Sequence, residues 1–225
     1  MAKESESIAS SNAQQVGSLS ELAEKLVSRL HDNRTIVAIA GAPGSGKTTI
    51  SDLLQTELES QHHLSTQIVP MDGFHFDNAV LQQRGLISRK GSPQTFDIHG
   101  LENILLRLKN SPSCGVTVPV FDRENDLSRA SARDIKQSTR VILVEGNYLL
   151  LDVEPWSALK RYFDITIMIN CDEPVLRKRL TKRWLDLDFT ETEARQKVER
   201  NDLPNAQEVI DKSRKADITF TSARD

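Results

Sequence analysis

The chain has 225 residues, with 29 Lys and Arg against 32 Asp and Glu, and a formal net charge of -3 at pH 7. This near balance gives no reason to expect a nucleic-acid partner, and no apolar run approaches the roughly 20 residues that cross a bilayer. Met1 to Gln15 lack the apolar centre of a secretory signal. Cys114 and Cys171 lack the spacing of a disulfide framework or a zinc site. We therefore expect a cytoplasmic, reduced protein that binds neither nucleic acid nor a membrane.

Residues 1–17 are rich in Ser, Gln, Glu and Ala, which predicts a disordered tail. Ser18 and Glu21 then have the spacing of a capping box, and leucines follow at helical intervals, which predicts a helix over 19–31. An uninterrupted run rich in β-branched residues over 35–40 predicts a strand that is buried on both faces. Similar runs recur at 66–69, 116–120, 141–144, 165–169 and 217–221.

Segments with helical periodicity, such as 101–108 and 173–184, lie between most of these strands. This alternation predicts right-handed crossovers and a mainly parallel sheet, with five strands at least, covered by helices on both faces. The stretches 84–98 and 121–138 have weak periodicity, so we expect them to be binding loops. Because no repeat or low-complexity linker follows the tail, residues 18–225 are predicted to form one three-layer α/β domain.

The most specific motif follows the 35–40 strand and precedes a helix-compatible segment. It matches the G-x-x-x-x-G-K-[ST] phosphate loop, or Walker A pattern, at every fixed position. Its residues are Gly41, Ala42, Pro43, Gly44, Ser45, Gly46, Lys47 and Thr48, with Thr49 continuing into the helix. Glycines let the backbone amides turn toward a phosphate, and the helix N-terminus adds positive potential. We expect Lys47 to bind the β- and γ-phosphates of ATP and Thr48 to hold Mg²⁺.

A phosphate loop leaves the reaction open, and other motifs separate the classes. The chain has no Asn-Lys-x-Asp guanine reader of a GTPase and no Ser-Gly-Gly-Gln signature of a transporter ATPase. The 141–144 strand ends in Glu145 without the second acid of motor-type ATPases. A kinase that transfers phosphate to the alcohol of a small-molecule acceptor is therefore preferred. A nucleotide hydrolase serving as a switch or chaperone for a partner protein, and a regulatory module without turnover, stay open as alternatives.

Asp72 follows the predicted 66–69 strand. Because the carboxyl ends of parallel strands form the ligand crevice of an open sheet, we expect Asp72 to face Lys47. There a carboxylate could orient or deprotonate the acceptor hydroxyl, or it could serve only as a helix cap or loop acid.

Beyond the phosphate loop, further motifs lie at 71–75, 78–85, 89–97, 119–122 and 144–146. As an ordered set, from about residue 36 to about residue 184, they resemble the phosphoribulokinase/uridine kinase family, in its pantothenate kinase-like branch. The resemblance implies a P-loop NTPase fold of the nucleotide-kinase-like type, with ATP and Mg²⁺ as cofactors. It also implies that Asp72 acts on the acceptor hydroxyl.

The acceptor is not named by this resemblance. Where pantothenate kinases carry an aromatic residue followed by a Ser-His pair, this chain has Phe121, Asp122, Arg123 and Glu124, and in the family these positions touch the acceptor. The residues expected on the acceptor side are Phe74, His75, Arg89, Phe121, Asp122 and Glu145. Arg89 could equally keep a loop soluble, and His75 could equally be a satisfied hydrogen-bonding residue.

Glu145 ends a buried strand beside the phosphate loop, where we expect it to contact Mg²⁺ or the acceptor, with a structural ion pair as the alternative.

The basic helix 173–184 is predicted to be a lid. At about 100° per residue, Arg179 and Arg183 share a face near its leucine stripe, so they could neutralise the transferring phosphoryl group. A solvated basic face is the alternative. The oligomeric state is left undecided, with a homodimer as one option, and so is the choice of ATP over GTP.

Overall fold

A computed structural model describes residues 14–110 and 114–221, and its centre is a six-stranded sheet. All paired strands are parallel, and the strand order is β1-β8-β7-β2-β6-β3. The strands are β1 (Gln14–Val16), β2 (Thr35–Gly41), β3 (Thr66–Pro70), β6 (Val141–Gly146), β7 (Ile165–Asn170) and β8 (Ile218–Thr221). Every residue of β2 and β6 is buried, which explains why these central strands are the most continuous apolar runs in the sequence.

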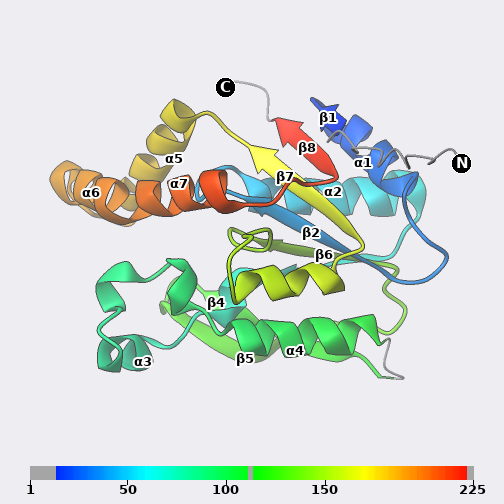
Figure 1. Cartoon of the computed structure of the whole chain (residues 1–225), viewed down its shortest axis with the longest axis horizontal. Coiled ribbons are helices and arrows are strands. Elements are labelled where there is room, and N and C mark those ends of the chain that lie inside the picture. The colour runs from blue at the N-terminus through cyan, green and yellow to red at the C-terminus, as the bar shows by residue number, and fades with distance from the viewer. Residues whose placement is uncertain (1–13, 111–113, 222–225) are drawn as a thin grey trace, which may run out of the picture.

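Seven α-helices surround the sheet in the described part of the chain. They are α1 (Leu19–Val27), α2 (Lys47–His62), α3 (Asn78–Gln83), α4 (Ile98–Lys109), α5 (Glu173–Leu185), α6 (Glu191–Lys197) and α7 (Leu203–Lys212). Shorter helical turns are η1 (Met71–Phe74), η2 (Ile87–Arg89), η3 (Pro93–Thr95), η4 (Trp156–Tyr162) and the π-helical η5 (Val198–Asp202). Helices α5, α6 and α7 project together at one end of the molecule (Figure 1).

Alternate residues of the central strands point into two separate apolar clusters. Val37 and Leu143 pack with α1 and α2 on one face of the sheet. On the other face, Ile36 and Ile142 pack with α4, with η4 and with the hairpin of β4 (Val116–Asp122) and β5 (Leu127–Ile135). The three-layer α/β architecture and the mainly parallel sheet predicted from the sequence are therefore confirmed.

The structure corrects two expectations about individual segments. The predicted tail overlaps β1, which pairs with β8 at the sheet edge because Val16, only 2% exposed, enters the core; residues 1–13 of that tail lie outside the described residues. The 116–120 run forms β4 (Val116–Asp122), which is not in the main sheet. It pairs in antiparallel fashion with β5 (Leu127–Ile135), a segment expected to be a loop. Most β5 side chains are exposed, so its sequence lacks the apolar alternation of a half-buried strand.

Other segments agree with expectation more closely. The lid candidate 173–184 forms α5, whereas α1 ends at Val27, before the expected limit at residue 31. Within the described ranges, no helix is both long and apolar enough to cross a membrane.

Candidate active site

The phosphate loop connects the end of β2 to the start of α2. Gly44 and Gly46 have φ of 79° and 91°, a left-handed conformation in which side chains other than glycine are strained. Gly46 caps α2 without a side-chain hydrogen bond, so no side chain occupies the amides of the first turn. The Ser45 hydroxyl is buried and has no partner within the described structure. Free amides at a helix N-terminus fit the phosphate groups of a nucleotide.

Lys47 is directed into the protein at the start of α2. Its side chain is almost buried, and its Nζ lies 3.5 Å from the backbone oxygen of Ala42. Burial lowers the pKa of Lys47, while the charges of Glu145 and Asp72 act in the opposite direction. The ammonium group therefore shares one electrostatic environment with both carboxylates.

Glu145 lies at the end of β6, in register with Ile39 of β2 and Pro70 of β3. It is 5% exposed, and the Thr48 hydroxyl donates to its Oε2 at 3.5 Å. Burial raises the pKa of Glu145 to about 7, and the nearby Lys47 charge limits the rise. This pairing of a hydroxyl with a carboxylate supplies the hard oxygen ligands that Mg²⁺ prefers.

Within residues 14–110 and 114–221, no group of three or more His, Cys, Asp or Glu side chains forms a metal cage. Thr48 and Glu145 could therefore hold Mg²⁺ only in part. This is the usual arrangement where nucleotide phosphates and water complete the coordination.

Asp72 belongs to η1, directly after β3. Its Oδ2 accepts from Arg123 Nη2 at 2.9 Å, and its backbone oxygen lies 2.8 Å from His75 Nδ1. The Asp72 charge also acts on the pKa values of Lys47 and Glu145. The structure thus brings the residues at the ends of β2, β3 and β6 to one place, as expected for a parallel sheet.

A close contact fixes η1 against β4. A Cβ added to Gly73 would lie 2.3 Å from the backbone oxygen of Pro119, so only glycine fits there without a shift. The Ser128 hydroxyl of β5 also donates to the Gly73 oxygen. The β4–β5 hairpin and the Asp72 turn are therefore one packed unit.

His75 and Phe121 form the aromatic part of the site. The His75 ring lies 4.0 Å from the Phe96 ring and 4.7 Å from the Phe121 ring, measured between centroids. Burial lowers the pKa of His75, which favours the neutral imidazole. Phe74, expected on the acceptor side, is instead packed in the core with Met71, so its position gives no support to an acceptor contact.

Two further residues expected on the acceptor side have structural partners. Arg89 donates to the backbone oxygen of Arg200 at 2.9 Å and to Asn205 Oδ1 at 3.3 Å, which ties η2 to η5 and α7. The Asp122 carboxylate accepts from the Asn125 amide at 3.1 Å within the β4–β5 turn. Both contacts position loops around the site.

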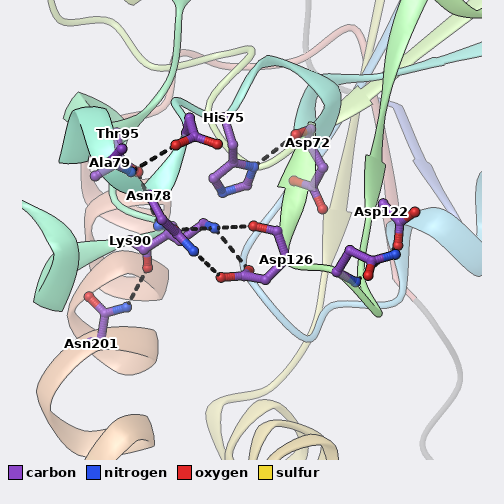
Figure 2. A network of polar contacts seen from close by, with 12 residues as sticks. Asp72, His75, Asn78, Ala79, Lys90, Thr95, Asp122, Asp126 and Asn201 are labelled. Carbon is purple, nitrogen blue, oxygen red and sulfur yellow. Dashed lines mark hydrogen bonds and ion pairs between the residues drawn. The ribbon is translucent and has the colours of Figure 1, made fainter. Parts of the chain in front are cut away.

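A polar network centred on Lys90 was not predicted as a unit (Figure 2). Lys90 Nζ lies 2.7 Å from Asn78 Oδ1 and 2.9 Å from Asp126 Oδ1, and Asn201 donates to the Lys90 backbone oxygen at 2.9 Å. Figure 2 shows Asp72 and His75 next to this network. The network connects α3, the β4–β5 turn and η5. Because its members are far apart in the chain, no sequence spacing indicates it.

The lid candidate packs on the phosphate loop through its leucines, with Leu176 and Leu180 in one cluster with Ala42. Arg179 Nη1 donates to the backbone oxygen of Ser45 at 3.4 Å. The Arg183 charge lowers the pKa of Lys47, and its guanidinium lies 5.7 Å from the centre of the Trp184 ring. Arg179 therefore lies on the side of α5 that faces the loop, whereas Arg183 contacts its own neighbour Trp184.

Arg123 is the site residue that sequence reasoning did not assign. The signal for it was present, because Arg123 stands where the chain departs from the pantothenate kinase pattern. Its contact with Asp72 joins residues that are 51 positions apart and could not be inferred from spacing.

Comparisons with known proteins agree with this geometry. The profile of the Phosphoribulokinase / Uridine kinase family matches residues 36–222. A protein proposed to be a uridine kinase in Schizosaccharomyces pombe is 30% identical over 202 residues, which cover 86% of this chain and 86% of that protein. The pantothenate kinase of Myxococcus xanthus is 32% identical over 162 residues, which cover 69% of this chain but only 51% of that kinase.

A solved structure extends the similarity to three dimensions. The crystal structure of a kinase proposed for a fructose transport system in Silicibacter sp. TM1040 has a TM-score of 0.86 and 39% identity. The match covers 91% of this chain and 99% of that one. With its P-loop kinase fold and a profile match over most of its length, the chain belongs to the phosphoribulokinase/uridine kinase family.

Proposed function

We propose that this protein is a Mg·ATP-dependent kinase that phosphorylates an alcohol group of a small acceptor, in the class of sugars, nucleosides and vitamin-like molecules. The observation that carries the proposal is the register of β2, β6 and β3, whose neighbouring ends lead to the phosphate loop, Glu145 and Asp72, with the Thr48 hydroxyl bonded to Glu145. In agreement with this geometry, the charges of both carboxylates oppose the effect of burial on the pKa of Lys47. A cation for phosphates and a carboxylate for a hydroxyl are the two halves of a phosphotransferase site.

The proposed roles follow from position. The loop amides and Lys47 bind the phosphates, and Thr48 with Glu145 supplies part of the Mg²⁺ coordination. Mg·ATP, when bound, supplies the phosphoryl group and the charge that activates it. Asp72 orients or deprotonates the acceptor hydroxyl, and placement matters more than basicity in a loose phosphoryl-transfer transition state.

Arg179 and Arg183 are proposed to bind the charge that develops on the transferred group. Their helix packs on the phosphate loop, which supports a lid that brings both guanidinium groups toward the phosphates.

The pantothenate kinase relative phosphorylates a small molecule, and this chain matches 51% of its length, so the acceptor cannot be transferred from its name. A cytoplasmic location is part of the proposal, and the homodimer stays a prediction.

The test is an ADP-release screen of the purified protein with Mg·ATP and small alcohols. We expect slow background hydrolysis that one class of acceptor stimulates. Asp72→Asn should reduce the stimulated rate by about 10²- to 10⁴-fold, the usual effect of losing a positioned catalytic group. Asp32→Asn is the matched control, because Asp32 is exposed in the loop between α1 and β2.

Nucleotide turnover that no acceptor stimulates and that Asp72→Asn leaves unchanged would refute the kinase. That result would favour the alternative of a nucleotide hydrolase acting on a partner protein.

A further inference from the structure

Arg123 presents its guanidinium to the carboxylate that is proposed to act on the acceptor. It lies in the turn between β4 and β5 and binds Asp72 Oδ2 at 2.9 Å, yet 59% of its side chain is exposed. Ion pairs with this much exposure contribute little to stability, typically about 0–1 kcal/mol. Fold stability is therefore a poor reason for an arginine at this position, and a role in the site is the better one.

Other cations on this side of the site are already used by the fold. Lys90 is 16% exposed and binds both Asn78 and Asp126. Arg89 donates to a backbone carbonyl of η5. Arg123, by contrast, combines high exposure with a partner from the proposed chemistry. Of these three cations it is the one most accessible to a ligand.

The field of Arg123 also reaches the phosphate side of the site. Burial is the main cause of the lowered pKa of Lys47, and the Arg123 charge adds a small effect in the same direction. Burial also raises the pKa of Glu145, and the Arg123 charge slightly opposes that rise. These small effects agree with the position of the guanidinium beside Asp72.

The ion pair has a consequence for the acceptor. While Arg123 donates to Oδ2 of Asp72, that oxygen is not fully available to an acceptor hydroxyl. A neutral alcohol would have to compete with a charge-assisted hydrogen bond, and its own oxygen is a weaker acceptor for the guanidinium than a carboxylate is. An alcohol that also carries an anionic group replaces the carboxylate as the partner of Arg123 and leaves Asp72 free for the hydroxyl.

We propose that Arg123 binds an anionic group, a carboxylate or a phosphate, of the acceptor, and that this residue selects hydroxy acids or sugar phosphates over neutral alcohols. The inference rests on the proposed kinase function. Before any acceptor binds, Arg123 Nη2 and Asp72 Oδ2 are 2.9 Å apart, so a molecule that binds both side chains needs its hydroxyl and its anionic group near each other. The acceptor is accordingly a small molecule with the two groups close together.

The test uses matched series of probes in the ADP-release assay: glycerol, glycerate and glycerol phosphate, and ribose, ribonate and ribose phosphate. We expect at least one anionic member to have a kcat/KM about tenfold or more above that of its neutral counterpart. The carboxylate and phosphate arms of each series identify which anion is preferred.

Substitutions at Arg123 make the test specific. Arg123→Gln should lower kcat/KM for the preferred anionic probe by about 10- to 100-fold, mainly through KM, and should not lower it for the neutral probe, because the competing hydrogen bond to Asp72 is lost. Arg123→Lys should recover part of the loss, because it keeps the charge but not the two-pronged geometry. Arg129→Gln is the matched control, since Arg129 is in the same hairpin, is 60% exposed and pairs with Asp122.

The possible failures are distinguishable. Neutral probes whose kcat/KM equals or exceeds that of their anionic counterparts, with turnover that Asp72→Asn abolishes, would keep the kinase and overturn the anionic acceptor. If no probe is phosphorylated, calorimetric titration of the same probes in the presence of a non-hydrolysable Mg·ATP analogue decides. Anionic probes that bind wild type at least tenfold more tightly than Arg123→Gln would support the inference, and equal or absent binding would overturn it.

Discussion

Replacing Glu145 with Gln should remove a pH dependence of stability from the nucleotide-free protein. Burial raises the pKa of this carboxyl from 4.5 to about 7. Between these values the folded protein binds more protons than the unfolded chain, so the free energy of unfolding falls as pH rises and levels off above about 7. At about 1.4 kcal/mol for each pH unit, the loss between pH 4.5 and about 7 is at most about 3.5 kcal/mol.

The assay is urea unfolding of both proteins at about pH 5 and about pH 8, where the two ends of this transition lie. Glu145→Gln cannot ionise, so its stability relative to wild type should increase by about 2–3 kcal/mol between these conditions. Glu24→Gln, on the exposed face of α1, should follow the wild-type curve. If wild type and Glu145→Gln lose stability in parallel, the carboxyl is ionised at ordinary pH in the folded state and the electrostatic account of the site is wrong.

Three further substitutions test other parts of the structure. Gly73→Ala should cost about 1–3 kcal/mol, because its Cβ would meet the Pro119 oxygen at 2.3 Å, whereas Gly17→Ala meets nothing within 4 Å; equal thermal unfolding of the two variants would contradict this. Lys90→Met should lower the free energy of unfolding in urea by about 1–3 kcal/mol, because it leaves a half-buried network without its cation. A decrease below about 1 kcal/mol, as for an exposed ion pair, would argue against the network. Burial lowers the pKa of His75, so as pH falls below about 6.5 the unfolded chain binds a proton at this residue before the folded protein does, and the free energy of unfolding decreases. His75→Phe should make this decrease smaller. If the free energy of unfolding falls with pH equally steeply in wild type and His75→Phe, the cause is not His75.

The residues proposed to contact the acceptor and the phosphate loop belong to separate parts of the fold. The β4–β5 unit carries Phe121 and Arg123 and touches the Asp72 turn through Gly73. The parallel sheet holds the phosphate loop independently, through β2 and its neighbours.

Several features were readable from the sequence because they depend on neighbours along the chain. The phosphate loop is eight consecutive residues between a buried strand and a helix, and its positive-φ glycines are where the motif puts them. The central strands β2 and β6 were visible as apolar runs, because both of their faces are buried. Helix α5 was visible from the spacing of Leu176 and Leu180.

Tertiary structure decided the features that depend on partners distant in sequence. Val16 is an isolated apolar residue in a polar stretch, and only pairing with β8 makes its segment a strand. The exposed residues of β5 form a strand because β4 lies beside them. The contact of Asp72 with Arg123 and the contacts of Lys90 join loops whose approach is set by packing. Local pattern therefore predicted the phosphate loop and the strands and helix around it, whereas the contacts of Asp72, Arg123 and Lys90 arise between segments that have no common periodicity.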